Sequence, residues 1–456
     1  MPRSKERLDN SKEQEHSHDF KSSEEKSVRV KLLDWYDDKK RDLPWRRYAN
    51  EQDPNKRAYA VWVSEIMLQQ TQVATVIDYY NRWMAKWPTV QDLANASLEE
   101  VNEVWSGLGY YSRGKRLFEG SKKVCEELNG RMPSDAVSLE QKLPGVGRYT
   151  AGAIASIAFK EATGVVDGNV IRVLSRLRLI GANSTSKIAS GKFWQLSNSL
   201  VDSARPGDFN QAMMELGATV CTPKTPQCAM CPLKVHCMAY KQVEDSKKTK
   251  TSEFLTKGNM QNGSRVSADI EECGLCLCST WDVSLGVCNY PTKPKKKEIK
   301  QETFGACLLQ KNNENGLVVV KRPESGLLAG LWEFPNTQLD TTQNNATSTI
   351  TRFLSEEIGL TKFTSQKELG EVMHKFSHCH HIYKVYHFVC EETKLKQVLR
   401  PVKWITKEEI KDAAMPMAMR KIFRLYEDTV SNKRKLNTFH NTMKKQKTMD
   451  SFFKAK

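Results

Sequence analysis

Four cysteines stand close together in the proline-rich stretch CTPKTPQCAMCPLKVHC, residues 221–237. Cys221, Cys228, Cys231 and Cys237 follow the spacing C-x6-C-x2-C-x5-C. Thiolates this near one another can complete one tetrahedral site, and both zinc and an iron–sulfur cluster accept four such ligands. The alternative, four unrelated buried cysteines, fits poorly with the prolines and the C-x2-C core. The stretch therefore predicts a loop that folds around one metal centre.

Composition narrows the class of protein. The chain has 456 residues, 12 cysteines and a net charge of +16, and such a basic chain favours an anionic partner. The segment 431–456 contributes eight Lys/Arg and one acid, so about half of the excess lies elsewhere. No apolar run is long enough to span a membrane, and the N-terminus lacks a secretory signal and is too acidic for a typical mitochondrial presequence. We expect the cytosol or nucleus, where cysteines serve as ligands or buried thiols.

The pattern divides the chain into five parts. Residues 1–27 are polar, and we expect them to be disordered. Residues 28–240 show helical spacing of apolar positions, and residues 241–300 have the composition of a connector. Residues 301–427 mix strand patterns, such as FGACLLQ, LVVVKR and HIYKVYHFVC, with helical ones, STITRFLSEEIGL and PMAMRKIFRLYED, which predicts an α+β domain. Residues 428–456 form a basic tail.

The stretch LPGVGRYTAGA, residues 143–153, opens like a helix but carries Pro144, Gly145 and Gly147 in its first positions. Proline and glycine are costly inside a helix, which indicates a tight hairpin that leads into one. The backbone N–H groups around Gly145, Val146 and Gly147 can then point outward and bind a phosphate, aided by the positive end of the helix. Such a site can hold a phosphate backbone without sequence readout.

Two carboxylates stand in apolar settings. In AVWVSEIMLQQTQV, Glu65 shares a helix face with Val61 and Leu68, and burial there would favour its protonated form. In GVVDGNVIRVLSR, Asp167 follows two valines and precedes a helix. A boundary salt bridge for Glu65 and an N-cap for Asp167 are the simpler interpretations. Such a pair also suits a transition state with oxocarbenium character.

These motifs together resemble the helix-hairpin-helix DNA glycosylases. WVSEIMLQQTQV, GLGYYSRG and NQAMMELGATVCTP narrow the resemblance to the eukaryotic branch of the MutY family of adenine DNA glycosylases. The resemblance is strong over about residues 30–240 and looser over 301–425. It implies a mainly helical N-terminal domain in which the four cysteines hold a [4Fe–4S] cluster. It also implies base-excision repair of double-stranded DNA, in which adenine opposite 8-oxoguanine or guanine is removed by hydrolysis of the N-glycosidic bond.

The resemblance assigns roles to individual residues. Glu65 would protonate the flipped adenine and later help to activate water, while Asp167 would stabilise or capture the sugar cation. Tyr149 and Asn169 would orient these groups. Arg46, Leu68 and Gln211 would line the adenine pocket. Gln70 and Tyr110 would fill or wedge the base stack near the opposite base. A core aromatic is the alternative for Tyr110.

Tyr149 stands where glycosylase/lyases similar to endonuclease III carry a lysine that attacks the sugar. A phenol forms no Schiff base, so a monofunctional enzyme that leaves an abasic site is expected. The alternatives are an endonuclease III-like glycosylase/lyase, which Tyr149 and the second domain disfavour, and a non-catalytic scaffold for damaged DNA. The presence of both Glu65 and Asp167 disfavours the scaffold.

The second domain resembles a degenerate Nudix fold. GLWEFP and RFLSEEIGL match parts of that family, but Phe353, Gln338 and Asn344 replace residues of its catalytic box. Missing carboxylates imply poor Mg²⁺ binding, which favours a binder over a hydrolase. The resemblance implies that Phe376, Ser377 and His378 recognise 8-oxoguanine. A metal site or a polar strand is the alternative for the histidines at 374, 378, 380 and 381.

The connector resembles that of mammalian homologues, in which one zinc ion is completed by an N-terminal histidine. Here Cys273, Cys276 and Cys278 follow a shorter spacing, C-x2-C-x-C, with Cys288 further on. His18 is the best-placed fourth ligand and His16 its alternative. The connector is also where other repair or checkpoint proteins are expected to bind.

The C-terminal QKTMDSFF resembles the peptide that binds the sliding clamp, proliferating cell nuclear antigen. Gln446, Met449, Phe452 and Phe453 would supply its polar edge and its apolar plug. A basic tail that merely ends in two phenylalanines is the alternative. NKRK and PKKK are typical of nuclear-import signals, so we expect a nuclear monomer, with a mitochondrial isoform left open.

Overall fold

The computed structural model describes residues 17–255, 273–277, 279–292, 299–311, 316–323, 326, 328–340, 346–376, 379–391, 395 and 400–429. Predictions for His16, Cys278, Ser377 and His378 and for the clamp residues Gln446, Met449, Phe452 and Phe453 lie outside these ranges. Contacts divide the chain into two compact units, residues 1–65 with 126–296 and residues 66–125 with 297–456. No helix in the described ranges is long and apolar enough to cross a membrane.

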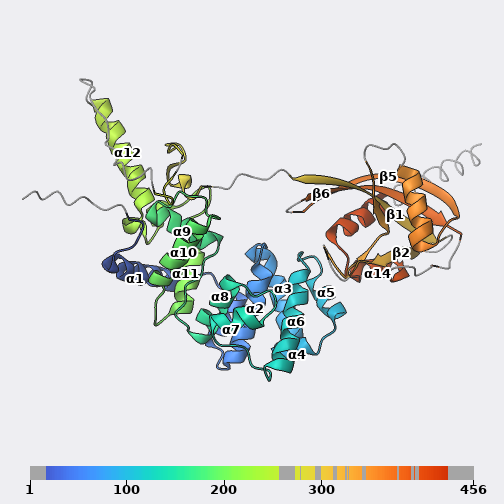
Figure 1. Ribbon diagram of the computed structural model, residues 1–456, viewed down its shortest axis with the longest axis horizontal. Coiled ribbons are helices and arrows are strands. Elements are labelled where there is room, and N and C mark those ends of the chain that lie inside the picture. The colour runs from blue at the N-terminus through green and yellow to red at the C-terminus, as the bar shows by residue number, and fades with distance from the viewer. Residues whose placement is uncertain are drawn as a thin grey trace, which may run out of the picture. The chain divides into compact units, whose positions relative to one another are not determined.

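The first unit is helical (Figure 1). Its helices are α1 (Ser22–Lys39), η1 (Pro44–Asn50), most of α2 (Pro54–Leu68), α7 (Ala136–Lys142), α8 (Arg148–Phe159), α9 (Gly168–Arg178), α10 (Lys187–Leu200), α11 (Pro206–Thr219), η2 (Cys228–Met230), η3 (Lys234–His236), α12 (Met238–Leu255) and η5 (Gly286–Asn289). The apolar stripe of α1, with Val28 and Leu32, packs against α9, α10 and α11. This burial of apolar surface fixes the helices that carry the candidate site.

The N-terminal part of this unit differs from expectation. Helix α1 begins at Ser22, within the segment 1–27 that we expected to be disordered. Phe20 is 8% exposed and belongs to the core of α1, so apolar burial orders a segment whose composition is polar. At the other end of the domain, α12 runs past the expected limit at residue 240, to Leu255.

The hairpin predicted at residues 143–147 joins α7 and α8. Gly145 has φ +76°, a left-handed conformation that favours glycine. Gly147 is the N-cap of α8, and the Ala151 N–H donates to its carbonyl at 2.9 Å. An added Cβ at Gly147 would meet nothing within 4 Å, so its environment is open. The hairpin thus presents the start of α8 beside an open backbone, as the predicted phosphate site requires.

The second unit combines helices with a sheet. Its helices are α3 (Val73–Lys86), α4 (Val90–Ala94), α5 (Leu98–Trp105), α6 (Ser112–Glu127, whose last residues belong to the first unit), α13 (Ala346–Phe353), η6 (Leu354–Ile358), α14 (Lys407–Asp412) and residues 417–429. The Arg420 guanidinium donates to the Ser106 hydroxyl at 3.0 Å, which links the sheet domain to the α5–α6 turn. Residues 66–125, which were expected within the helical domain over 28–240, belong to the same unit as the sheet.

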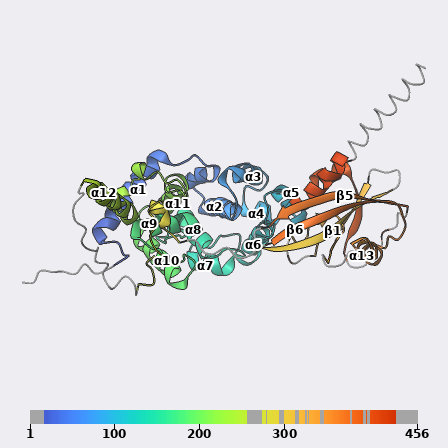
Figure 2. The same ribbon diagram turned by 90° about the horizontal axis from the view of Figure 1, so that it is seen from above.

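Within the described residues the sheet has seven strands: β1 (Lys300–Lys311), β2 (Gly316–Lys321), β3 (Trp332–Glu333), β4 (Asn336–Gln338), β5 (Phe363–Lys375), β6 (Cys379–Cys390) and β7 (Val402–Thr406). The order along its main path is β3-β2-β1-β6-β5; β1 and β6 are parallel, and β5 and β6 are antiparallel. Alternate residues of β1 face opposite cores: Leu308 packs with the helix 417–429, and Leu309 with α13 (Figure 2). This confirms the α+β class expected for the second domain.

Candidate active site

Glu65 lies in the last turn of α2 and is 7% exposed. Burial raises the pKa of its carboxyl to about 7; the hydrogen bond with Tyr149 opposes this rise, and the charge of Asp167 adds to it. The boundary salt bridge considered from the sequence does not form among the described ion pairs. Glu65 is therefore a buried acid that can hold or release a proton near neutral pH.

Asp167 is the N-cap of α9, as the simpler interpretation of the sequence proposed. Its Oδ1 accepts hydrogen bonds from the N–H groups of Asn169 at 2.9 Å and Val170 at 2.7 Å. Its Oδ2 accepts one from the Asn169 side-chain amide at 2.7 Å. Burial raises the pKa of Asp167 above its usual range, and these hydrogen bonds pull it back. The capping hydrogen bonds thus orient the Asp167 carboxylate, and its charge raises the pKa of Glu65.

Tyr149 lies in the first turn of α8 and joins this pair. Its hydroxyl contacts the Met214 sulfur at 3.1 Å and takes part in the hydrogen bond with Glu65. Burial, followed by the charges of Glu65 and Asp167, raises the pKa of Tyr149 well above its usual value. The phenol is therefore neutral and can donate a proton to a hydrogen bond. The structure brings Glu65, Tyr149 and Asp167 together, with Asn169 beside Asp167.

Arg172 was missed by the sequence reasoning. Its Nη2 donates to the Asn169 side-chain oxygen and to the Gly217 carbonyl, both at 2.7 Å, and its Nε donates to the Cys221 carbonyl at 2.7 Å. Gly217 allows the close packing, because an added Cβ would lie 2.6 Å from the Asn169 Cβ. Arg172 therefore ties the Asp167–Asn169 pair to the cysteine loop. Its position three residues after Asn169 on one helix face was the available signal.

Arg46 and Gln211 also meet, as predicted for the adenine pocket. The Arg46 Nε donates to the Gln211 side-chain oxygen at 3.2 Å, and both residues line a cavity of about 560 Å³. Glu215, 1% exposed, accepts from Arg46 at 2.9 Å and from Arg41 at 2.6 and 2.9 Å. Sequence reasoning missed Glu215 and Arg41. Leu68, the third residue predicted for this pocket, ends α2 in the second unit and is half-buried.

Gln70 and Tyr110 belong to the second unit, and both have left-handed backbones, with φ 56° and 48°. Tyr110 is 46% exposed, so it is not the core aromatic considered as its alternative. Arg113, 7% exposed and not predicted, donates to the carbonyls of Ile66 and Met67 at 2.9 Å and to that of Gly109 at 3.0 Å. A guanidinium at this helix end satisfies terminal carbonyls and holds the segments that carry Gln70 and Tyr110.

Tyr110 lines a second cavity of about 560 Å³ together with His374 and Phe376 from β5 and its end. Glycines 326 and 330 line the same cavity. The cavity therefore brings the predicted DNA-stack residue and the first residue of the predicted base-reading loop to one place. It is a candidate site for the base opposite adenine.

The four loop cysteines line one cavity with Arg176 and Val287. Among the described residues, no three of these thiols lie within 4.8 Å of one another, although His18, Cys273 and Cys276 do. Ligands of a single tetrahedral ion must be closer than this, whereas a multi-atom cluster holds its ligands further apart. Burial raises the pKa of the Cys231 and Cys237 thiols to about 12, so their ionisation requires a bound cation. The cavity thus fits an iron–sulfur cluster better than one zinc ion.

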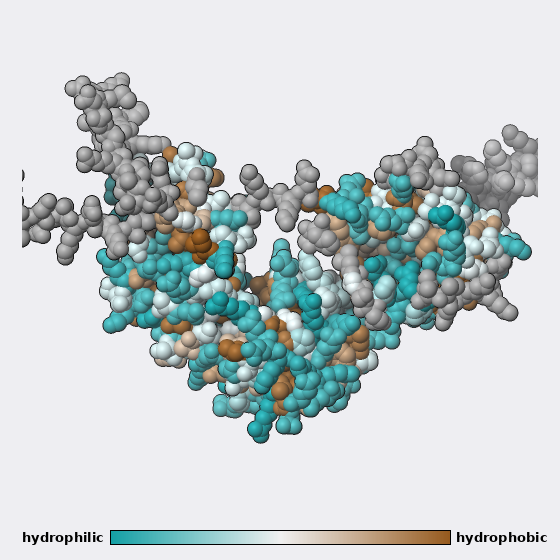
Figure 3. Space-filling view, in the orientation of Figure 1, coloured by the Kyte–Doolittle hydropathy of each residue, from teal (hydrophilic) through white to brown (hydrophobic). Residues whose placement is uncertain are grey.

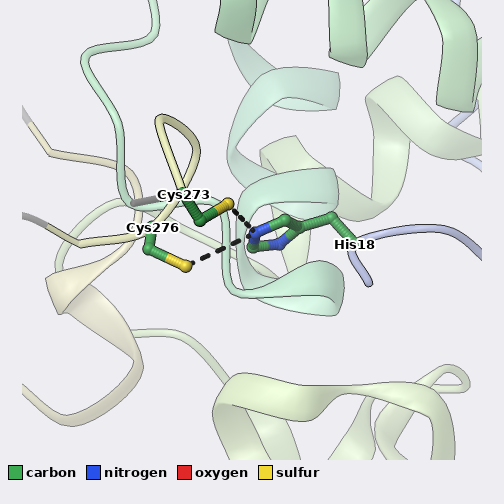
Figure 4. A group of neighbouring side chains, drawn as sticks. All are labelled: His18, Cys273 and Cys276. Atoms are coloured by element: carbon green, nitrogen blue, oxygen red, sulfur yellow. Dashed lines mark hydrogen bonds between the residues drawn. The ribbon is translucent and has the colours of Figure 1, made fainter. Parts of the chain in front are cut away.

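His18 forms a second candidate metal centre with Cys273 and Cys276 (Figure 4). Its Nδ1 lies 2.6 Å from the Arg178 carbonyl, to which it donates, and this leaves the lone pair on Nε2. Nε2 lies 3.5 Å from the Cys273 sulfur and 3.6 Å from the Cys276 sulfur. These separations suit the edges of a tetrahedral zinc site. Cys288 lies elsewhere, its sulfur 3.6 Å from an Arg176 nitrogen.

Comparison with known proteins defines the class. The family of HhH-GPD superfamily base excision DNA repair proteins matches residues 63–199, and the NUDIX domain family matches residues 305–425. The chain is 51% identical over 415 residues to the adenine DNA glycosylase of Mus musculus, across 90% of this chain and 79% of that protein. It is 49% identical over 451 residues to that of Homo sapiens, across 94% and 81%. The chain belongs to the adenine DNA glycosylases, enzymes of base excision repair.

Among solved structures, the C-terminal domain of mouse MUTYH in complex with human PCNA is similar to part of the chain. That similarity covers 28% of this chain and 90% of that one, with 31% identity and a TM-score of 0.26. The expected class, an enzyme that cleaves a base from DNA, is confirmed by the family relationship. The scaffold alternative is set aside with it.

Proposed function

We propose that this adenine DNA glycosylase removes adenine opposite 8-oxoguanine or guanine by hydrolysis and leaves an abasic site without cutting the strand. The observation that carries the proposal is the buried Glu65, whose pKa is raised to about 7 beside Tyr149 and Asp167. At neutral pH about half of such carboxyls hold a proton, which suits a general acid. The flipped adenine would accept this proton, so that a better leaving group departs.

Asp167 would act on the sugar. Loss of the base leaves positive charge at the anomeric carbon, and a fixed carboxylate stabilises that charge or captures the cation. Three hydrogen bonds from Asn169 and Val170 hold the Asp167 oxygens, so little reorganisation is needed during the reaction. Glu65, now an anion, would then accept a proton from the attacking water.

Tyr149 supports the monofunctional part of the proposal. By resemblance Tyr149 stands where glycosylase/lyases carry a lysine, and a buried, neutral phenol forms no Schiff base but can hydrogen-bond Glu65. The test is a duplex with adenine opposite 8-oxoguanine. We expect the adenine strand to break only after alkali treatment. Strand scission without alkali, with a borohydride-trapped covalent complex, would contradict the proposal.

DNA would be held by both units. In the hairpin at Gly145, Val146 and Gly147, the open position is Gly147, the N-cap of α8, which suits phosphate binding, whereas the Val146 N–H already donates to the Leu143 carbonyl at 3.3 Å. Exposed Tyr110 and Gln70 are suited to enter the base stack. On the face drawn in Figure 3, the described surface is largely hydrophilic with scattered apolar patches.

The sheet domain would read the base opposite adenine through Phe376, Ser377 and His378. The cavity shared by Phe376 and Tyr110 supports this role. Replacement of Ser377 and His378 by alanine should lower the preference for 8-oxoguanine over guanine, because a lost hydrogen bond costs roughly 1–3 kcal/mol. An unchanged preference in single-turnover assays would move lesion reading to another part of the chain.

Two metal centres belong to the proposal. Cys221, Cys228, Cys231 and Cys237 would hold a [4Fe–4S] cluster, which would fix the loop that Arg172 contacts. His18, Cys273 and Cys276 would bind one zinc ion, with Cys278 as the fourth ligand to be tested. Metal analysis of purified protein should find about four iron atoms and one zinc per chain. A colourless, active protein with two zinc ions would contradict the cluster.

The tail motif would bring the enzyme to a sliding clamp in the nucleus. A peptide of residues 440–456 should bind the clamp with a Kd of about 1 µM or below, through Met449, Phe452 and Phe453. The peptide with both phenylalanines replaced by alanine is the control and should not bind. Equal binding of the two peptides would leave the tail as a basic segment without this role. Partners at the connector are proposed only as repair or checkpoint proteins.

A further inference from the structure

A group of rings lies beside the first residue of the base-reading loop. Three strands that are adjacent in the sheet supply it: β1, β5 and β6 (Figure 2). We call it the ring cluster; its members are Phe304, His374, Phe376, His381 and Tyr383. The Phe376 ring meets His374 at 4.5 Å and His381 at 4.8 Å between centroids, both edge to face. The Phe376 ring thus packs between two imidazole rings.

His381 is the anchored member of this pair. It is 8% exposed, and both of its ring nitrogens have partners. Nδ1 lies 3.2 Å from the Tyr383 hydroxyl, and Nε2 lies 3.2 Å from a Glu302 carboxylate oxygen and 3.3 Å from the Cys379 sulfur. A ring with its proton on Nε2 donates to Glu302 and accepts from Tyr383, so the two contacts fix the plane of the imidazole.

These partners also include types that bind metals, but they do not form a metal site. Among the described residues, only His18, Cys273 and Cys276 place three ligand atoms within 4.8 Å of one another. The Cys379 sulfur and the Glu302 carboxylate therefore approach His381 from directions too far apart to share one ion. Among the described residues, His381 therefore belongs to no group of three metal ligands, and its burial among these partners suits a positioning role.

We propose that His381 is a positioning residue for recognition of the base opposite adenine, acting through Phe376. Phe376 opens the loop 376–378, and its N–H donates to the Cys379 carbonyl at 2.8 Å, which joins the two ends of the loop. It also lines the cavity that contains Tyr110. A fixed His381 therefore sets the direction in which the Phe376 ring faces this cavity. The inference rests on the proposed reading role of residues 376–378.

The test uses the full-length enzyme and single-turnover excision of adenine opposite 8-oxoguanine and opposite guanine. The measured quantity is the ratio of the two rates. His381→Leu removes the ring and its polar links, and we expect the ratio to fall about three- to tenfold, the effect of losing one aromatic pair. His381→Phe keeps a ring against Phe376 but no link to Glu302, and its ratio should lie between that of His381→Leu and that of the unchanged enzyme.

A double-mutant cycle separates positioning from general support of the fold. If His381 acts through Phe376, then His381→Leu should change the ratio little in a chain that already carries Phe376→Leu. Full additivity of the two substitutions would overturn the proposal. His380→Ala is the matched control, because the neighbouring side chain of a strand points to the other face, and its ratio should equal that of the unchanged enzyme.

The loop variant distinguishes the two levels of the inference. If Ser377→Ala with His378→Ala lowers the ratio and no His381 variant does, the loop reads the base but His381 does not position it. If neither set changes the ratio, the reading role of the loop fails and the positioning role fails with it. Thermal unfolding of each variant identifies one that does not fold, and His381→Phe, which keeps the volume of a ring, then carries the test.

Discussion

Two buried glutamates of the helical unit stand in opposite electrostatic surroundings. Glu65, at the end of α2, is 7% exposed and has a phenol and a second carboxylate as neighbours. Glu215, in α11, is 1% exposed and lies between the guanidinium groups of Arg41 and Arg46. Burial raises the pKa of Glu65 to about 7. At Glu215 burial acts in the same direction, but the two arginines outweigh it and hold the pKa below its usual value.

The difference shows that burial alone does not assign a role to an acid. A carboxyl without a counter-cation keeps its proton and can give it to a substrate. A carboxyl between two arginines remains an anion and holds them in place, here Arg46 at the candidate adenine pocket. A buried carboxyl without a counter-cation lowers the free energy of unfolding at high pH. A carboxylate between two arginines lowers that free energy only when one partner is removed.

The largest effect is expected for Glu65→Gln. The amide has nearly the same shape but cannot donate a proton to the leaving base, so the single-turnover rate of adenine excision should fall on the order of a hundredfold or more. Binding of the duplex should persist, because residues other than Glu65 contact the phosphates. Gel-shift and excision assays on the same duplex measure both quantities. Glu103→Gln, at an exposed position of α5, is the control and should be indistinguishable from the unchanged enzyme.

A Glu65→Gln enzyme with an unchanged rate would place the acid elsewhere and remove the contrast between the two glutamates. A loss of both rate and DNA binding would instead indicate a damaged fold. Circular dichroism of the variant separates these results, because the amide should leave α2 intact.

Glu215→Gln should act mainly on stability. It leaves Arg46, 14% exposed, and the more open Arg41, 39% exposed, without their anion. Removal of one partner of a fully buried pair costs about 3–5 kcal/mol, and the exposure of Arg41 reduces the expected cost to about 2–4 kcal/mol. Urea unfolding at pH 7 measures the change in the free energy of unfolding. Glu244→Gln, which breaks a more exposed pair with Lys247, is the matched control and should change that free energy by less than about 0.5 kcal/mol. Equal effects at the two sites would contradict the comparison.

The free energy of unfolding should depend on pH differently in the unchanged enzyme and in the Glu65→Gln variant. Its folded pKa is about 7, above an unfolded value near 4.3, so between these values the folded chain keeps a proton that the unfolded chain has lost. Wild-type stability should therefore fall as pH rises through this window. The glutamine of Glu65→Gln does not titrate. The free energy of unfolding of this variant, relative to that of the unchanged enzyme, should therefore increase from pH 5 to pH 8, by up to roughly 3 kcal/mol. A difference that is constant with pH, measured by urea unfolding, would exclude an elevated pKa.

Much of this site could be predicted because its signals are local. Glu65 stands on an apolar helix stripe, and Asp167 stands directly before a helix, so spacing alone indicated burial for one and a cap for the other. The glycine hairpin and the cysteine spacing are local in the same sense. The apolar stretches FGACLLQ and LVVVKR likewise predicted strands, and β1 and β2 form over them.

The parts that could not be predicted depend on contacts between distant residues. Glu215 meets Arg41 across 174 positions, and nothing near Arg41 indicates that partner. Phe20 lies in a polar segment and is ordered only because the helical core receives it. Arg113 caps the end of α2 from a different helix. Such contacts follow from the packing of whole helices, which periodicity does not determine.

The smallest effect, and the sharpest test of the contrast, is expected for Tyr149→Phe. The phenol hydrogen bond favours the ionised form of Glu65 and thus lowers its pKa against the stronger influence of burial. Without that bond the Glu65 pKa should rise further, so the alkaline limb of the excision rate should move to higher pH by a few tenths of a unit to one unit. Single-turnover rates between pH 6 and pH 9 measure the limb. Glu215 is held by its two arginines and should not respond to the loss of the Tyr149 hydroxyl. The contribution of the Arg41–Glu215–Arg46 group to the stability of the enzyme therefore serves as the internal control. A shift to lower pH would mean that the Tyr149 hydroxyl stabilises the protonated carboxyl instead, and the role of the phenol would have to be reversed.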